Sequence, residues 1–537
     1  MGRETSLRNR VMSRHPASAL VVAALIAAFG IAACTIGPDY NREPAPVSTT
    51  FKELKGWKRA SPSDQIDRGE WWTPYRDPRL ATLLREVEIS NQNVAAQAAA
   101  YEQARALIRE AQSAFLPLAT AGYGVTRTRT GALAGTSSTR LAIASSTSYL
   151  TTYNAPISGS WDLDVWGKVR RQVESNTAAA QASAADLANV KLSQQAMLAT
   201  AYFNLLAADS LADLLRRTVD QFQETERVTQ AKVDAGCCVA PLTPVSPADL
   251  ALAKANVENA QAQLINVGVQ RAQFEHAIAA LIGRPPAELS IGPHLLGGAI
   301  PRIPVTVPST LLERRPDIAA AERTMDEENA LIGVAEAAYF PDISLSSMIQ
   351  FIGPIPLPFS AARSIGSIAA TGTQTLFNGG LTAAQVDAAR AAYWQSVASY
   401  RQTVLTAFQQ VEDELAAIRI LSRQLTVQQQ AVKDAAEAVR VDTNQYRQGT
   451  VDLTTVVTAE VTLLQNQESE LTVRQNLFLA SVALIEALGG GWDIGLMPTQ
   501  HELQRDFTLF QTLPPSPPVL GPVPAGTDGP GADSARP

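Results

Sequence analysis

The sequence predicts a mainly α-helical fold with a smaller membrane β-portion, arranged as an internal repeat. Two windows, residues 168–235 and 381–448, contain neither Gly nor Pro over 68 residues each. Just before each window, the apolar residues change from helical spacing to alternation. Short motifs also return after about 224 residues. Together these observations favour one chain in which strands followed by a long helix occur twice.

The internal repeat is visible in the sequence itself. The motif NVAA at 93–96, followed by AFLP at 114–117, returns as DIAA at 317–320 and AYFP at 338–341. Each copy should therefore hold the same series of elements. Chance similarity between alanine-rich helices is the alternative explanation. The domain limits that we predict are 34–298 for the first copy, 299–512 for the second, and 513–537 for a disordered Pro/Gly-rich tail.

Each window without Gly or Pro is long enough for a helix of about 100 Å. A shorter helix is expected after each one, at 248–282 and 453–488, with Gly236 or Gly449 in the turn between the two helices. Glycine is favoured just after a helix because that position needs a positive φ. Each pair is therefore predicted to be an antiparallel hairpin. Among the apolar positions of the second window that should face a packed seam are Leu405 and Phe408.

The N-terminus predicts export and lipidation. Several arginines precede an apolar run at 17–33, and the motif IAAC that ends at Cys34 resembles a bacterial lipobox. A transmembrane anchor is the alternative, since the run is about as long as the shortest membrane spans. We expect a signal peptide at 1–33, a lipid such as palmitate on Cys34 and, because Thr35 rather than Asp follows, delivery to the outer membrane of a Gram-negative bacterium. The start of translation is open between Met1 and Met12.

Alternating segments precede each long helix. The odd positions of 151–163 are mostly apolar and the even ones polar, and 343–351 repeats the pattern, while 119–129 and 366–377 are weaker candidates. A soluble sheet shows the same alternation. In an exported outer-membrane protein, a transmembrane barrel with its apolar face to lipid is the better interpretation. Four strands cannot close a useful barrel, so strands that span the membrane require self-association.

Composition and motifs give no support to an enzyme. The net charge of −7 and the isoelectric point near 5.4 argue against nucleic-acid binding. No phosphate-binding loop or metal-ligand motif is present, so we expect no catalytic residues, no cofactor and no metal site. The acidic run Asp326-Glu327-Glu328 is predicted to be a solvated helix face. Adjacent Cys237 and Cys238 are expected to be free thiols, with a strained vicinal disulfide as the alternative.

The chain resembles a known family, the outer membrane efflux proteins of the TolC-like type, in their NodT-type lipoprotein subgroup. The resemblance covers nearly everything from 34 to 492. It is carried by CTIGPDYNREP, GEWWTPYRDPRLATLL, WDLDVWGKVRRQVES, LLERRPDIAAAE, AYFPDISL, TLFNGG, YRQGTVDL and ALGGGW. The resemblance implies a homotrimer whose 12-stranded outer-membrane barrel, with four strands from each chain, continues into a periplasmic α-helical barrel. It also implies an equatorial domain, a periplasmic adaptor and an inner-membrane transporter, often of the resistance–nodulation–division class.

The resemblance further implies a gate at the periplasmic tips of the hairpins, where polar side chains hold the tunnel shut in family members. Tyr446 stands at the matching position of the motif YxxG. Tyr446 and Arg440 are six residues apart and should reach different partners, each tying its helix to a neighbouring one. Ordinary helix-end charge and capping is the alternative for each residue. The candidate gate and tip residues are Arg227, Asp234, Gly236, Arg440, Asp442, Tyr446, Arg447, Gly449 and Asp452.

The function predicted from the sequence is a passive exit duct of a tripartite efflux pump, involved in resistance to drugs or other small molecules. One alternative is the outer-membrane channel of a type I protein secretion system, which shares the fold. Another is a structural periplasmic lipoprotein that forms no pore, against which the alternating hairpins argue. The sequence names neither the substrate nor the particular adaptor and pump.

Overall fold

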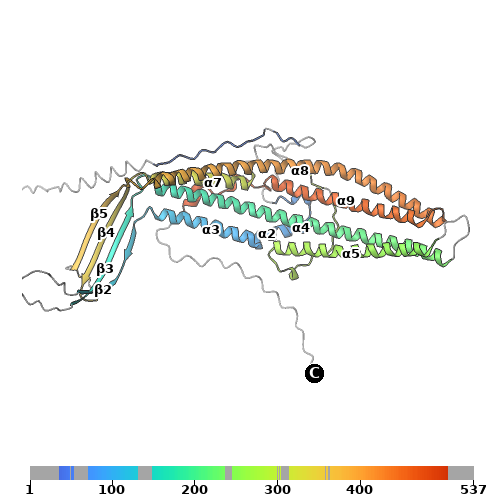
Figure 1. The fold of residues 1–537 in the computed structure, drawn as a ribbon, viewed down its shortest axis with the longest axis horizontal. Helices are drawn as coiled ribbons and strands as arrows, with labels where there is room; N and C mark the ends of the chain where they lie inside the picture. The colour runs from blue at the N-terminus through green and yellow to red at the C-terminus, as the bar shows by residue number, and fades with distance from the viewer. Residues whose placement is uncertain are drawn as a thin grey trace, which may run out of the picture.

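The structure, a computed structural model, is elongated, with a β-sheet at one end and the tips of two helix hairpins at the other (Figure 1). Cys34, the pair Cys237 and Cys238, Gly236 and the predicted tail at 513–537 lie outside the described residues. The residues that the structure describes are 35–48, 50–53, 70–130, 148–235, 245–298, 300–301, 303, 314–356, 359–360 and 363–505.

The two long helices are present where the sequence places them. Helix α4 spans Lys168–Asp234 and α8 spans Leu381–Gln448. Each begins after a glycine with positive φ, Gly167 at 83° and Gly380 at 89°. Helix α8 also ends at such a glycine, Gly449, whose φ is 77° and whose N–H donates to the carbonyl of Tyr446.

The internal repeat is confirmed by the lengths of the matching elements. Helices α3 (Gln92–Ser113) and α7 (Pro316–Ala337) both contain 22 residues, and α5 (Pro247–Leu281) and α9 (Leu453–Ala487) both contain 35. Helix α5 packs back on α4 as α9 packs back on α8, which forms the two predicted hairpins. The remaining helical segments are α2 (Pro78–Ser90), α10 (Gln500–Gln504) and three 3-10 turns at Thr73–Tyr75, Pro286–Glu288 and Ile494–Leu496.

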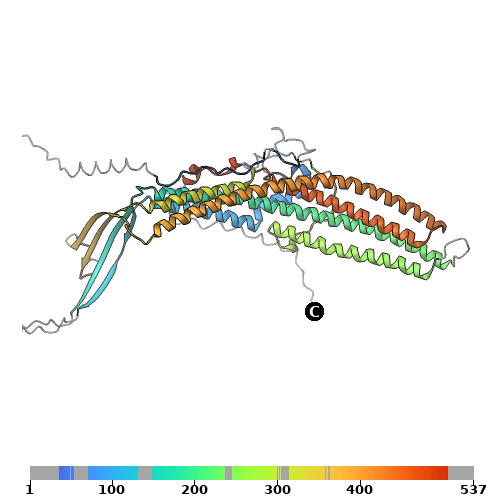
Figure 2. The ribbon, with the colours of Figure 1, turned by 45° about the horizontal axis from the view of Figure 1, so that its top comes forward.

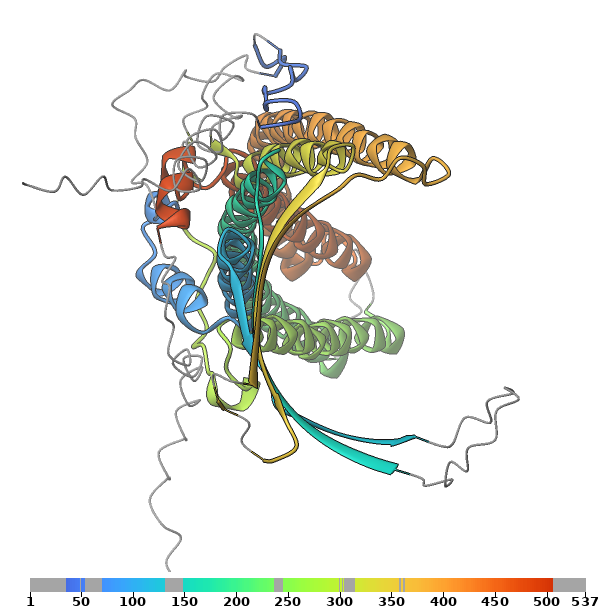
Figure 3. The ribbon, with the colours of Figure 1, turned by 90° about the vertical axis from the view of Figure 1, so that its left-hand side faces the viewer.

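The helices form one curved layer. Near the sheet the order of neighbours is α3–α4–α7–α8, and toward the tips it is α5–α4–α9–α8 (Figure 2). Viewed along the long axis, this layer is an arc, with α2 and α10 on its outer side (Figure 3). Within the described residues, none of the helices combines the length and apolarity that a membrane crossing needs.

The sheet contains four strand positions in the order β1/β2–β3–β4–β5, and all its neighbours are antiparallel. Segments β1 and β2 keep the same register against β3 and form one strand interrupted at 122–123. Pro156 explains the interruption: Gly122 N–H donates to its carbonyl at 2.8 Å, but proline has no N–H to return the bond. The strands are β1 (Leu118–Ala121), β2 (Gly124–Thr130), β3 (Ser148–Asp162), β4 (Asp342–Gly353) and β5 (Ser364–Thr373).

The largest apolar core lies at the waist of the molecule. Trp71 is fully buried and donates from its indole N–H to Gln195 at 3.0 Å. Asp77 caps α2 and also accepts a hydrogen bond of 2.7 Å from Tyr202 on α4. The region before α2 is therefore anchored on the long helix.

An N-terminal strap, residues 35–48 and 50–53, runs along α7 and α8. Arg171 on α4 donates to the carbonyls of Ile36 and Gly37 at 3.1 and 3.0 Å. Gly37 lies so close to Gly333 of α7 that an added Cβ would meet the Gly333 Cα at 2.4 Å. Further along the strap, Arg42 lies 3.3 Å from Glu322, a buried carboxylate of α7.

Two sequence expectations about helix faces need correction: within the single chain Leu405 does not face the seam, and Asp326 is not solvated. Leu405 is 47% exposed, and its neighbour Val404 is the fully buried residue, because the seam with α7 is centred on Val397, Tyr400 and Val404. Phe408, by contrast, packs against the core as expected. Asp326 does not lie on a solvated face: it is buried at the interface of α7 with α4 and the strap, and burial raises its pKa to about 6.

Candidate gate at the tips of the helix hairpins

The candidate gate lies where α4 and α8 end and α9 begins, at the end of the molecule farthest from the sheet (Figure 1). Gly449 closes α8, and Asp452 caps α9 by accepting from the N–H and hydroxyl of Thr455 at 2.9 and 2.6 Å. These hydrogen bonds hold the pKa of Asp452 below its usual value. Gly449 and Asp452 therefore shape the turn between α8 and α9.

Tyr446 joins two helices. Its ring is buried against Ala253 and Val456, and its hydroxyl lies 3.0 Å from Thr229 Oγ1 on α4. Thr229 donates its own proton to the carbonyl of Thr225 at 2.8 Å, so Tyr446 is the donor of the link. Burial raises the pKa of Tyr446, which keeps that proton in place.

Lys232 strengthens the same contact from α4. Its ammonium lies 3.8 Å from the centre of the Tyr446 ring, within the range of a cation–π interaction, and it donates to the Tyr446 carbonyl. Lys232 is thus a second donor, beside Gly449 N–H, to a carbonyl at the C-terminal end of α8, where cations are favoured. Neither the sequence motif nor the spacing indicated Lys232.

Glu460 of α9 is a second link that sequence reasoning missed. It is only 3% exposed, and one carboxyl oxygen accepts from Thr225 at 2.8 Å and from Gln221 at 3.3 Å. Its other oxygen has no hydrogen-bond partner among the described residues. Burial raises its pKa. The available signal was its place at helical spacing between the apolar residues Val456 and Leu463.

The arginines near the tips make exposed ion pairs. Arg440 pairs at 2.8 Å with Glu437 of its own helix, so within the chain it does not tie α8 to a neighbour as the sequence suggested. As expected, it does not share a partner with Tyr446. Arg227 pairs with Glu224 at 2.8 Å, and Arg447 reaches the same carboxylate at 3.5 Å, joining α8 to α4.

The two remaining candidates are acidic. Asp234 accepts from Gln230 at 2.7 Å within α4, and Asp442 is half-buried on α8. The described residues of the tips therefore divide into a buried set that joins helices and an exposed set of charges.

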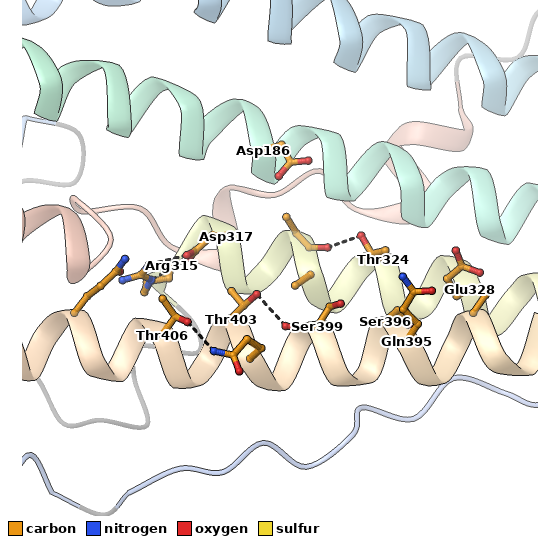
Figure 4. A pocket seen from close by; sticks show the side chains of 15 residues that line it. Asp186, Arg315, Asp317, Thr324, Glu328, Gln395, Ser396, Ser399, Thr403 and Thr406 are labelled. Carbon is orange, nitrogen blue, oxygen red and sulfur yellow. Dashed lines mark hydrogen bonds and ion pairs between the residues drawn. The ribbon is translucent and has the colours of Figure 1, made fainter.

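A polar groove of about 670 Å³ runs between α4, α7 and α8 (Figure 4). On α8, its lining residues Ser399, Thr406 and Gln410 lie on the face opposite to the one that the strap covers at Arg401. The strap lies on the outer side of the arc, so the groove belongs to the concave side (Figure 3). Hydroxyls, amides and carboxylates line it, as suits a water-filled passage.

Fold and site together define a class of protein. Within the described residues, a sheet with two unpaired edges continues into a curved helical wall about 100 Å long, with a polar groove on its concave side. The far end is held by links between helices, and within the described residues no cluster of three or more potential metal ligands occurs. These are the features of one subunit of a channel.

Comparison with known proteins then gives the family. Residues 83–284 and 307–490 match the family model described as outer membrane efflux protein. These two segments make up most of the chain, and the chain belongs to the outer membrane efflux protein family.

Two curated relatives and one solved structure match over most of their length. The pyoverdine export outer membrane protein OpmQ of Pseudomonas aeruginosa is 29% identical over 468 residues, covering 86% of this chain and 96% of that protein. The toluene efflux pump outer membrane protein TtgC of Pseudomonas putida is 27% identical over 480 residues, covering 87% and 94%. The outer-membrane channel OprN superposes with a TM-score of 0.77 at 26% identity, covering 86% of this chain and 100% of that one.

These matches confirm the family, the fold class, the outer-membrane location and the role as an efflux channel predicted from the sequence. The lipoprotein subgroup, the lipid on Cys34, the domain limits and the gate residues stay predictions.

Proposed function

We propose that three copies of this chain close into a duct through which small molecules leave the cell without a chemical step. A periplasmic adaptor and an inner-membrane transporter, of the resistance–nodulation–division class, supply the cargo and the energy. Four strand positions per chain then give a barrel of twelve strands, which removes the sheet edges that lipid does not tolerate.

The observation that carries this proposal is an apolar stripe on α8, at one edge of the helical layer. Its members are 47–71% exposed in the single chain and are separated by 11, 15 and 7 residues, close to whole numbers of helical turns. At the other edge, α5 exposes Ile265 and Val269. Two different apolar edges on one subunit suit a head-to-tail ring. The stripe consists of Trp394, Leu405, Ile420 and Val427.

Efflux of small molecules is favoured over protein secretion by the names of the relatives, which concern pyoverdine export and toluene efflux. The lipid expected on Cys34 adds a second attachment to the membrane, because the strap begins at Thr35 beside Gly167, where β3 passes into α4. The resting duct is closed at the tips by the links around Tyr446 and Glu460.

Planar-bilayer recording tests this function. Purified, cross-linked trimers should show discrete conductance steps, and cells that lack the gene should accumulate a pump substrate. A monomeric protein without conductance would instead support the structural lipoprotein. Restored export of a protein substrate, but not of small molecules, would support the secretion channel.

A further inference from the structure

The first strand pair carries two arginines, Arg127 and Arg129, on the face that the proposed barrel turns toward lipid. Arg127 and Arg129 of β2 point to the same side, since they are two residues apart, and Arg129 lies directly opposite Tyr149 of β3. That side is the apolar side of the sheet, because Ile157 and Trp161 share the parity of Tyr149. The other side of β3 carries mainly hydroxyls and an amide, from Thr152, Asn154, Ser158 and Ser160, with Leu150 at its outer end.

Tyr149 and Trp161 mark the two borders of the membrane. They are twelve residues apart on β3, about 40 Å along the strand or roughly 28 Å along the normal at a tilt near 45°. This matches an apolar band about 25 Å tall with aromatic residues at both edges. Trp161 is the inner border, because it donates to the carbonyl of Phe115 next to the helices. Tyr149 is therefore the outer border.

Arg127 and Arg129 are held at that outer border. The guanidinium carbons lie 4.9 and 6.0 Å from the centre of the Tyr149 ring. No Asp, Glu or Lys occurs anywhere between residues 111 and 161, so the pair has no carboxylate along this strand pair to neutralise it. Two uncompensated guanidinium groups at the level of lipid headgroups need an anion, and phosphate is the anion that arginine binds in bidentate fashion.

We propose that Arg127, Arg129 and Tyr149 form a binding site for the phosphate groups of phosphorylated glycolipids in the outer leaflet. The proposal rests on the proposed barrel, because its orientation places this rim outermost. The long aliphatic stems of the arginines lie along the apolar band while the charged heads reach the phosphates. The phosphates of the glycolipid thus neutralise the two arginines and hold the lipid at the outer rim of the channel.

Native mass spectrometry of the detergent-solubilised, full-length assembly tests the site. The probes are a diphosphorylated lipid A, the same lipid with its phosphates removed, and phosphatidylglycerol. The parent should bind diphosphorylated lipid A about tenfold more tightly than either other probe, since each charge-assisted hydrogen bond is strong. Arg127→Gln/Arg129→Gln should lose that preference. The matched control is Arg216→Gln/Arg217→Gln, an exposed pair about 70 Å along α4 from the sheet.

Three outcomes would overturn the proposal: equal binding of the two lipid A forms by the parent, unchanged binding by the β2 variant, or equally tight binding of phosphatidylglycerol. If the β2 variant fails to assemble, the comparison of the two lipid A forms on the parent still decides. Conductance of the same preparations separates this result from the proposed function. A conducting parent that ignores lipid phosphates refutes only the lipid site.

Discussion

Thr225 and Glu460 are joined by a 2.8 Å hydrogen bond one helical turn from the link between Thr229 and Tyr446. The two threonines, four residues apart on α4, therefore present one row of hydroxyls to both helices of the second hairpin. This row is the only described place near the tips where buried polar groups join the two hairpins through three helices, α4, α8 and α9. Opening the tips by moving one hairpin past the other must break it.

We expect Tyr446→Phe to raise single-channel conductance and to admit large antibiotics such as vancomycin without the pump. The variant removes a donated hydrogen bond worth about 1 kcal/mol in each copy. Thr229→Val should act in the same direction, and the double variant should add little, because both remove one link. Planar-bilayer recording and vancomycin sensitivity measure the effect.

Arg440→Ser is the control for this gate. Its exposed pair with Glu437 lies within one helix, and such pairs contribute little to stability. Its conductance should equal that of the parent. If assembled Tyr446→Phe channels conduct like the parent while Arg440→Ser channels open, the gate depends on contacts between copies, and Asp452 would be the next residue to change.

Val404→Asp and Leu405→Asp should fail in different ways. Val404 is fully buried against α7, so a charge there costs several kcal/mol, on the order of 3–5, and should prevent folding. Leu405 belongs to the exposed stripe of α8, so its variant should keep its helical content but lose trimers. Circular dichroism and cross-linking distinguish the two results. Normal trimers of Leu405→Asp would contradict the proposed stripe.

The stability of the region under the strap should fall as the pH rises through 6. Asp326 has a pKa raised to about 6 by burial, an effect that Glu174 and Glu322 increase and that Arg323 and Arg171 partly offset. A raised pKa means that the folded state holds the proton more tightly than the unfolded state. The contribution is present below the ordinary pKa of about 3.9 and is lost by pH 7, for a change of about 2 to 3 kcal/mol.

Asp326→Asn removes this pH dependence, because the amide stays neutral. Between pH 4.5 and 7.5, the melting temperature of the parent should fall relative to that of the variant. Other buried acids titrate in both proteins, so the difference between the two curves isolates Asp326. Parallel curves would show that Asp326 is charged in the folded protein throughout this range.

Cys34→Ser should abolish acylation. Metabolic labelling with palmitate should mark the parent and not the variant, since the thiol of Cys34 is the only expected site. The variant should accumulate as an unprocessed or soluble form in cell fractions. Label that persists in Cys34→Ser would refute the lipoprotein prediction.

Much of the fold could be predicted because its signals are local. The start of α4 after Gly167 and both limits of α8, at Gly380 and Gly449, follow from these glycines and from the absence of Gly and Pro within each helix. Alternation marked the sheet for the same reason, although the interruption opposite Pro156 depends on register, which a single strand does not reveal.

The candidate site was less predictable because it depends on which helices meet. Tyr446 stood out through its motif, but the role of Glu460 depends on Thr225 of α4 and that of Lys232 on Tyr446 of α8, each more than 200 residues away in sequence. Asp326 looked solvated for a related reason. The residues that cover Asp326 come from the strap and from α4, and the sequence of α7 itself does not indicate that these segments pack there.

The strap also sets an order of events during folding. Ile36 and Gly37 bind Arg171 about 135 residues later in the chain, Arg42 binds Tyr400, and Glu53 binds Arg419, 366 residues later. The part of the mature chain that is exported first must therefore wait until nearly all the rest has crossed the inner membrane. Contacts of such long sequence separation form late. The strap is thus expected to bind only after the helical layer has folded. In an unfinished or misfolded subunit, the N-terminal segment would stay unbound and accessible to periplasmic proteases.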